Sequence, residues 1–240
     1  MTTRLPRGML IDLDGTIIDS KLTAEEAWMS VCREVAPRLD TIPEELRGAI
    51  STAADWFWSD PQRGREGRAD LRTATRQIVE RALGGVGTAA AQLAAEIANQ
   101  FRDRRDQFAL LPGAVEAIEA LRARHISLAL MTNGAGPVQR EKIDRFDLCR
   151  HFDCVLIEGE LGFGKPDERI YRNAMATLRT APSDTWAVGD NLEWEVAAPQ
   201  RLGIYGVWVD STGSGLPPGR EVRPDRIIRS LADLLREADQ

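Results

Sequence analysis

The chain of 240 residues has few of the side chains on which much enzyme chemistry depends. It contains two histidines, three cysteines and three lysines, although basic residues number 31 in total. Two histidines cannot build a three-histidine zinc site, and no Cys-x-x-Cys pair is present. His125, at the end of a predicted helix, and His151, in a predicted loop, are expected to be surface or structural residues. The composition therefore disfavours zinc chemistry and a histidine general base.

Three further features are missing. No apolar run approaches the roughly 18 residues of a membrane span, so no membrane partner is expected. No signal peptide is recognisable, and an odd number of cysteines without regular spacing favours a reducing compartment, so the expected location is cytoplasmic. The net charge is −6 without a broad basic excess, so nucleic acid is not an expected partner.

What is present is an alternation of helix and strand patterns with one interruption. The apolar run from Gly8 to Leu13 predicts a first strand covered on both faces. Helical periodicity then dominates, with helices starting at Thr23 and Pro43, a helix at 68–83 closed by Gly84-Gly85, and a helix at 88–108. From residue 114 onward, predicted helices (114–124, 138–146, 168–178, 192–202) alternate with predicted strands (126–131, 154–157, 185–188, 205–209), before a short strand at 225–228 and a helix from 231.

This alternation predicts an α/β fold, a doubly wound parallel sheet with helices on both faces. The all-helical block interrupts the sheet after its first strand. We therefore expect a core domain formed by residues 1–20 and 109–240, and a second, all-helical domain formed by residues 21–108.

Polar side chains follow four of the predicted strands, where a parallel sheet binds its ligands. Three aspartates, a hydroxyl, an amide and one of the three lysines are expected to meet at this edge: Asp12, Asp14, Thr132, Asn133, Lys165 and Asp190. Carboxylates suit Mg²⁺, which shares its coordination shell with water and phosphate. A carboxylate can also attack phosphorus, a second one can transfer the protons, and a lysine can neutralise phosphate charge.

In order along the chain, Asp12-Leu13-Asp14-Gly15-Thr16, Thr132-Asn133-Gly134, Lys165-Pro166 and Gly189-Asp190 with Glu195 resemble the four motifs of the haloacid dehalogenase-like hydrolase superfamily. The resemblance covers essentially the whole chain and implies a Rossmann-like core with a helical cap. It implies that Asp12 is the nucleophile and Asp14 the general acid/base. Thr132, Asn133 and Lys165 would bind phosphate, and Asp12, Asp14 (through its backbone carbonyl) and Asp190 would bind Mg²⁺.

One position departs from the family pattern. Many members carry Asp at the second acidic place of the last motif, whereas here Glu195 stands five residues after Asp190. Its longer side chain is expected to reach the metal through a water molecule or to hold Lys165. Glu193 is a competing candidate that is expected to point elsewhere.

The helical block contains an aromatic and basic segment with two interpretations. Trp56 and Trp58, followed by Arg63 and Arg68, either pack between helices beside a solvated basic loop or select the substrate. Among the lysines, Lys142 is expected to be a surface residue. By contrast, the position of Lys165 before Pro166 in an arginine-rich chain suggests that a compact charge is needed there.

The favoured function is Mg²⁺-dependent hydrolysis of a small phosphorylated metabolite through an aspartyl phosphate. A haloacid dehalogenase needs neither Asp14 nor a metal, and a phosphonate hydrolase would use Lys21 for a Schiff base. A sugar-phosphate mutase and a non-catalytic phospho-acceptor or binding module remain further alternatives. The core motifs recognise phosphate and metal, which these substrates share, so they leave the particular substrate and the oligomeric state open.

Overall fold

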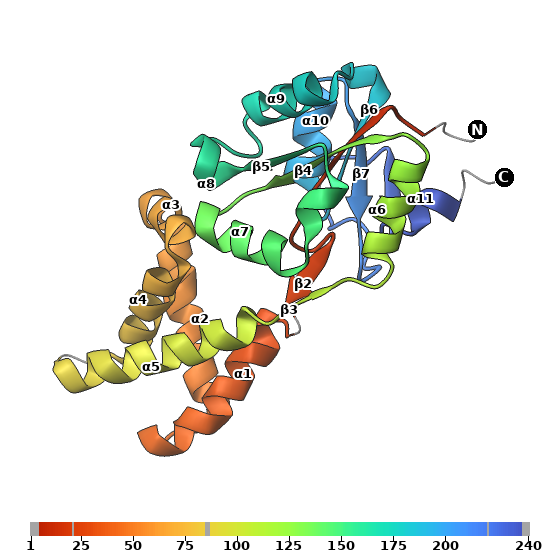
Figure 1. The fold of residues 1–240 in the computed structure, drawn as a ribbon. Coiled ribbons are helices and arrows are strands. Elements are labelled where there is room, and N and C mark those ends of the chain that lie inside the picture. Colours follow the sequence, from red (N-terminus) through yellow and green to blue (C-terminus); the bar gives the residue numbers. More distant parts are fainter. Residues whose placement is uncertain (1–4, 21, 85–86, 220, 237–240) are drawn as a thin grey trace. The chain divides into compact units, whose positions relative to one another are not determined.

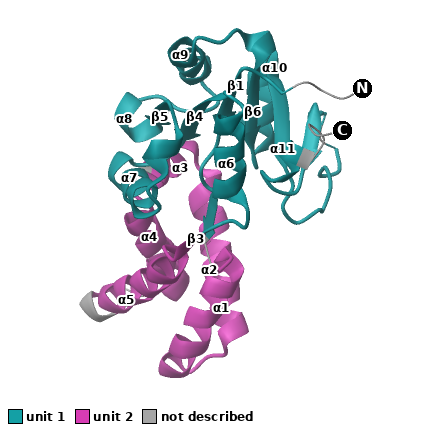
Figure 2. Ribbon diagram, turned by 45° about the vertical axis from the view of Figure 1, so that its right-hand side comes forward, with its two compact units in different colours: residues 1–19, 110–240 teal, residues 20–109 magenta. Residues whose placement is uncertain are grey.

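The computed structural model describes residues 5–20, 22–84, 87–219 and 221–236. The chain divides into two compact units, Met1–Asp19 with Leu110–Gln240 and Ser20–Ala109, which we call the core unit and the helical unit (Figure 2). The expected domain limits differ from these by one residue. Lys21 and Gly85 lie outside the described residues.

Six parallel strands of the described residues form the sheet of the core unit, in the order β5-β4-β1-β6-β7-β8 (Figure 1). The chain moves outward from β1 to β4 and β5, then returns to the other side of β1 with β6. This reversal is the switch point at which doubly wound sheets bind ligands. The predicted fold class is therefore confirmed. The strands are β1 (Gly8–Ile11), β4 (Ser127–Thr132), β5 (Cys154–Ile157), β6 (Thr185–Gly189), β7 (Tyr205–Val209) and β8 (Arg226–Ile228).

Helices cover both faces of this sheet because its strands are apolar on both sides. One face is packed by α9 (Glu168–Leu178), whose buried residues Ile170 and Ala174 contact the same cluster as Leu10 and Ala129. Figure 1 shows α6 (Ala114–Ala123) and α11 (Asp233–Arg236) beside each other on the core unit, where they contact one another. The remaining helical elements are α7 (Gly136–Arg145), η2 (Leu148–His151), α8 (Glu158–Leu161), η3 (Pro182–Asp184), η4 (Leu192–Ala197) and α10 (Ala198–Arg201).

Three details of the core unit differ from the sequence prediction. The expected helix 192–202 is a π-helical turn, η4, followed by α10, with Pro199 near the start of α10. His151 lies in the 3₁₀ helix η2 rather than in a loop. It is buried because η2 packs against α6 and α7. The last helix begins at Asp233, since Asp233 accepts hydrogen bonds from the backbone N–H groups of Arg229 and Ser230.

The helical unit begins as the sequence predicts. Thr23 and Glu26 form a reciprocal capping box at the start of α1 (Ala24–Val35). A short 3₁₀ helix, η1 (Ala36–Leu39), leads to α2 (Pro43–Ser59), which starts at the predicted proline. The stacked rings of Trp28 and Phe101, 3.9 Å apart between centroids, lie in the apolar centre of this unit.

Two predicted helices of this unit have wrong limits. The third, α4 (Leu71–Leu83), begins at Leu71 because the Asp70 side chain caps it by accepting from the Thr73 N–H. The supposed basic loop before it is another helix, α3 (Pro61–Ala69), capped by Asp60. The fourth, α5 (Thr88–Arg105), ends early because β3 (Phe108–Leu110) pairs with β2 (Ile18–Ser20).

Candidate active site

The first motif continues directly from β1 at the switch point. The Asp12 N–H donates to the carbonyl of Val188 over 3.0 Å, so the β1–β6 ladder extends one residue past β1. Asp12 therefore stands at the end of β1 beside Gly189, the last residue of β6. Thr132 ends the adjacent strand β4, so the predicted convergence at this edge holds for these residues.

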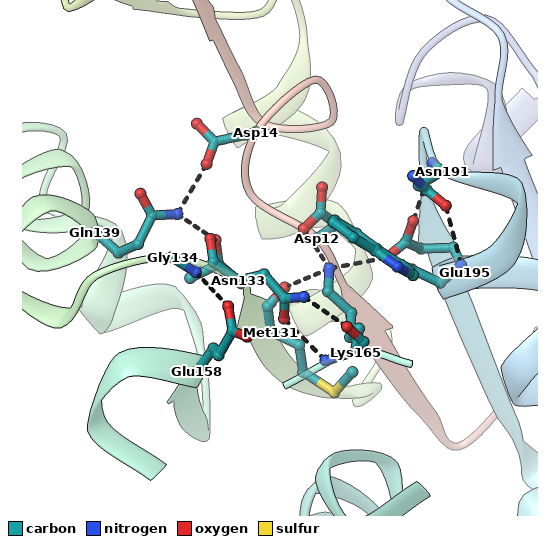
Figure 3. Close-up of polar contacts among 12 residues, drawn as sticks. Asp12, Asp14, Met131, Asn133, Gly134, Gln139, Glu158, Lys165, Asn191 and Glu195 are labelled. Atoms are coloured by element: carbon teal, nitrogen blue, oxygen red, sulfur yellow. Dashed lines mark hydrogen bonds and ion pairs between the residues drawn. The ribbon is translucent and has the colours of Figure 1, made fainter. Parts of the chain in front are cut away.

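The Lys165 ammonium connects Asp12 with Glu195 (Figure 3). Its Nζ lies 2.5 Å from Oδ1 of Asp12 and 2.8 Å from Oε1 of Glu195, and it also donates to the Met131 carbonyl over 3.1 Å. All three charged side chains are at most 10% exposed. Lys165 thus supplies the positive charge of a buried cluster that also contains these two carboxylates.

Burial and ion pairing act in opposite directions on this cluster. Burial disfavours the Lys165 ammonium, but the charges of Asp12 and Glu195 outweigh it and raise the pKa of Lys165. Burial raises the pKa of Glu195 to about 7, and it also raises the pKa of Asp12, with Lys165 opposing both shifts. Lysine therefore stays charged and is the group that favours the ionised form of Asp12.

Glu195 is held by two donors and faces Lys165. Its second oxygen, Oε2, accepts from the Asn191 backbone N–H at 3.0 Å. The side chain fits because position 189 is glycine, where an added Cβ would lie 2.3 Å from Cγ of Glu195 and 2.9 Å from Cβ of Asp12. Glu193, in contrast, turns outward to an exposed ion pair with Arg201. Of the two roles expected for Glu195, the geometry shows the contact with Lys165.

The π-helical turn η4 places Glu195 in this position, and sequence reasoning did not foresee it. Such turns are rare and are frequently found at functional sites. The Tyr171 hydroxyl donates to the Trp194 carbonyl over 2.6 Å and so satisfies a backbone group of the turn. The Trp194 ring also lies 5.8 Å from Nζ of Lys165, within the range of a cation–π contact.

Asp190 follows β6 and lies against the first motif. A Cβ at Gly15, whose φ is +78°, would fall 2.4 Å from Oδ2 of Asp190, so only glycine allows this approach. The Trp208 indole N–H holds the Asp190 carbonyl at 2.8 Å. Burial, together with the negative charges of Asp12 and Asp14 and against the pull of Lys165, raises the pKa of Asp190 to about 6.

The carboxylate oxygens of Asp12 and Asp190 fit a hard divalent cation. The charge of Asp12 disfavours ionisation of Asp190, and a cation bound to both carboxylates would relieve that repulsion. Within the described residues, no three carboxylate, histidine or cysteine side chains converge to hold a metal by themselves. Two carboxylates, completed by a backbone carbonyl, water and a substrate oxygen, match the coordination that Mg²⁺ prefers.

Thr132 and Asn133 have different surroundings although they are adjacent. Thr132 is buried at 1% exposure, and its Oγ1 accepts from the amide of Gln139. The Asn133 side chain bonds to the Lys165 backbone on both sides: its Nδ2 donates to the carbonyl at 2.6 Å and its Oδ1 accepts from the N–H at 2.9 Å. The Asn133 side-chain amide therefore fixes the segment that carries Lys165. Of the groups of Asn133, the backbone N–H is then the candidate for binding phosphate.

Asp14 has two partners on α7 that the sequence did not reveal. Gln139 donates to its Oδ2 at 2.8 Å, and Lys142 to its Oδ1 at 2.7 Å. The expectation that Lys142 is a surface lysine is therefore wrong, because its side chain is only 12% exposed and is ion-paired with Asp14. Gln139 and Lys142 are three residues apart and so lie on one face of α7, and this spacing is the sequence pattern that could have indicated a shared partner.

The aromatic and basic segment of the helical unit separates into two parts. Trp56 carries the guanidinium groups of Arg63 and Arg81 at 4.0 and 3.9 Å from its ring centre, and Arg63 also donates to the Trp56 carbonyl. These contacts agree with packing within the helical unit, one of the two interpretations considered, although Trp56 itself is 39% exposed. Trp58 and Arg68 are also exposed, so they stay candidates for contact with substrate.

No helix in the described part of the chain is both long and apolar enough to cross a membrane.

His125 is exposed and adopts a left-handed φ of 61° after α6, as suits a residue that ends a helix.

The doubly wound sheet thus presents carboxylates, a hydroxyl and a buried lysine at its switch point, where such sheets bind their ligands. A model of haloacid dehalogenase-like hydrolases matches residues 6–203, and the chain belongs to this family.

The chain is similar to several phosphatases. It is 36% identical over 178 residues to phosphoserine phosphatase of Thermus thermophilus, with 74% of this chain aligned to 65% of that protein, slightly less than two thirds of its length. It is 31% identical over 236 residues to N-acylneuraminate-9-phosphatase of Homo sapiens, covering 95% of this chain and 92% of the other. The magnesium-bound structure of the hydrolase YfnB from Bacillus subtilis shares the fold with a TM-score of 0.67 at 21% identity, covering 99% and 100% of the two chains.

Proposed function

We propose that this hydrolase is a Mg²⁺-dependent phosphatase that cleaves small phosphomonoesters through an aspartyl phosphate on Asp12. The observation that carries the proposal is the buried contact between Lys165 and Asp12 at the switch point, with Asp190 beside it. The similarity to two phosphatases supports the same class of substrate.

In the first step, Oδ2 of Asp12 attacks phosphorus while Lys165 holds Oδ1. The phosphorus–oxygen bond to the leaving alcohol breaks, and a proton from Asp14 goes to that oxygen. Thr132 donates its hydroxyl to a phosphoryl oxygen, and Lys165 offsets the charge that develops. The products of this step are the free alcohol and phosphorylated Asp12.

In the second step, water attacks the phosphorus of the aspartyl phosphate, and Asp14 takes up the proton of that water. The bond between phosphorus and Asp12 breaks, which releases phosphate and restores the carboxylate. Asp12, Asp190 and the Asp14 carbonyl are the residues that would hold Mg²⁺, whose positive charge would draw the phosphoryl oxygens and the nucleophile together.

The other members of the superfamily differ from this scheme at identifiable residues. A dehalogenase has no use for a held acid/base, whereas Asp14 is bound by two side chains here. A mutase would return the phosphoryl group to a sugar, so free phosphate in the product distinguishes the two activities. We assign substrate selection to Trp58 and Arg68 of the helical unit. The location in a reducing, cytoplasmic compartment stays a prediction.

Turnover of p-nitrophenyl phosphate tests the proposal. We expect release of free phosphate that requires Mg²⁺, stops on chelation and disappears in Asp12→Asn. Glu193→Gln is the control, because it also turns a carboxylate into an amide but at a side chain that points outward to Arg201. If the wild type hydrolyses no phosphate ester with Mg²⁺, the proposal is wrong. If the wild type does hydrolyse p-nitrophenyl phosphate, a screen would identify the substrate among sugar phosphates, nucleoside monophosphates, phosphoglycolate, phosphoserine and N-acylneuraminate 9-phosphate.

A further inference from the structure

Asp14 lies on the loop after β1, where a β-bridge to Ile18 fixes its backbone but not the direction of its side chain. Its side chain is 41% exposed, yet each carboxylate oxygen accepts a hydrogen bond from α7. Figure 3 shows the Gln139 amide directed toward Asp14, and the same amide also donates to Oγ1 of Thr132. An acid/base group must be held in a defined direction to transfer a proton efficiently.

We infer that Gln139 and Lys142 are positioning residues that hold Asp14 for proton transfer to the leaving group. This inference rests on the proposed function. Neither residue belongs to the motifs that define the site, and both act through the residues that they hold rather than on the phosphate ester: Lys142 through Asp14, and Gln139 through Asp14 and Thr132.

Gln139 fixes the acid/base relative to the residue expected to bind phosphate. It is only 2% exposed, and its Nε2 donates to Oδ2 of Asp14 and to Oγ1 of Thr132. The Thr132 oxygen accepts from Gln139, and its hydroxyl makes only a long contact of 3.4 Å to the Asn133 carbonyl, so that proton can turn instead toward a phosphoryl oxygen. One buried amide thereby sets the distance between the phosphate-binding hydroxyl and Asp14.

Lys142 holds the other oxygen of the same carboxyl group. Lys142 and Asp14 are 128 positions apart in the chain, so their contact restrains the Asp14 loop against helix α7. A carboxyl group offers about four lone-pair sites, so two donors leave room for it to carry and deliver a proton. On the same helix, Arg140 makes an ion pair with Glu160 that is 38% exposed at both ends and touches nothing in the site.

The test compares two substrates that differ in how much they need an acid. The p-nitrophenolate ion leaves readily without a proton, whereas the alkoxide of glycerol 2-phosphate requires one. The ratio kcat/KM reports only the steps up to release of the alcohol, so the later hydrolysis of the phosphoenzyme does not enter it. The variants are Gln139→Leu, Lys142→Met and Lys142→Arg, with Arg140→Gln as the control on the same helix.

We expect Lys142→Met and Gln139→Leu to lower kcat/KM for glycerol 2-phosphate about ten-fold or more beyond any loss for p-nitrophenyl phosphate, as general-acid catalysis contributes at least that much. Lys142→Arg should recover part of the difference, and Arg140→Gln should match the wild type. Adding Lys142→Met to Asp14→Asn should cause no further selective loss.

Equal losses on both substrates, or no loss on either, would overturn the inference. Thermal unfolding of each variant distinguishes a folding defect, and the milder Lys142→Arg keeps the comparison informative if Gln139→Leu does not fold. A wild type that hydrolyses p-nitrophenyl phosphate while the variants show equal losses would leave the proposed function standing and remove only this role.

Discussion

Nζ of Lys165 lies 2.5 Å from Oδ1 of Asp12, with the two side chains 1% and 10% exposed. The same ammonium reaches Glu195, so one buried cation serves two buried carboxylates. This arrangement links the stability of the core unit to the group that is proposed to attack phosphorus.

Removal of that cation should affect both stability and activity. In Lys165→Met, Asp12 and Glu195 would remain buried without a counter-charge, so we expect a loss of about 3 kcal/mol or more in the free energy of unfolding, together with loss of phosphatase activity. Denaturant unfolding and steady-state assays measure the two effects. Arg201→Met breaks an exposed pair with Glu193 and should cost less than about 1 kcal/mol.

Lys165→Arg tests whether a compact charge is needed. A guanidinium is wider than an ammonium, and the cluster packs Lys165 among Asp12, Glu195 and the Met131 carbonyl. We expect most activity to be lost although the positive charge remains. Full activity of this variant, measured with p-nitrophenyl phosphate, would show that charge alone is sufficient.

Gly189→Ala should disrupt the same cluster from the other side. The added methyl group would lie 2.3 Å from Cγ of Glu195 and 2.9 Å from Cβ of Asp12, so one of these side chains must move. We expect lower stability and loss of activity. Gly48→Ala is the matched control, because a Cβ there meets nothing within 4 Å and alanine in helix α2 should stabilise by about 0.5–1 kcal/mol. An active, stable Gly189→Ala would contradict the account.

Two arginines of the helical unit should behave differently. Arg63 stacks on Trp56 and donates to its backbone, so Arg63→Ala should lower the melting temperature. Arg68 is exposed, so Arg68→Ala should leave the melting temperature near that of the wild type and raise KM for substrates with a second anionic group. An unchanged substrate profile in Arg68→Ala would argue that this arginine only faces solvent.

A loop after β7 provides a pH-dependent prediction outside the site. Asp210 accepts from the N–H groups of Gly213, Ser214 and Gly215, and these bonds, that of Gly215 foremost, lower its pKa below the usual 3.8. A carboxyl group with a lowered pKa in the folded state stabilises the fold above its unfolded pKa, and this stabilisation is lost as pH falls through the folded value. Asp210→Asn should therefore melt lower than the wild type at pH 7.

The difference between Asp210→Asn and the wild type should shrink as the pH falls below 3.8, where the carboxyl of the unfolded chain takes up a proton, and should level off once the pH has passed through the lower pKa of the folded carboxyl. Melting curves across pH measure it. A difference that stays constant from neutral to acidic pH would mean that the charge of Asp210 does not stabilise the loop.

The convergence of the motif residues could be predicted because parallel strands end at one edge of a sheet. Asp12 and Thr132 follow strands whose apolar runs are unambiguous, and Lys165 stands out as one of three lysines. The contact of Glu195 with Lys165 was one of two stated possibilities. The sequence could not separate them, because the π-helical turn that directs this side chain has no distinct residue pattern.

The remaining errors arise where local patterns are weak. Helix α3 is rich in charge and glycine and buries little apolar surface, so periodicity could not reveal it. Strands β2 and β3 have three residues each, too few for a reliable alternation. Gln139 and Lys142 were missed because motif reasoning treats α7 as a connection, whereas their contact with Asp14 arises only from the packing of α7 against the first motif.

The central claim is that Asp12 becomes phosphorylated, and trapping that intermediate tests it most directly. The Asp14→Asn variant, in which the second step should be slow, is mixed with p-nitrophenyl phosphate and Mg²⁺, quenched in acid and digested for mass spectrometry. We predict the added mass of one phosphoryl group on the peptide that contains Asp12, and none when Asp12→Asn is introduced as well. Release of p-nitrophenol with no phosphorylated peptide, or with the phosphoryl group on another residue, would contradict the account.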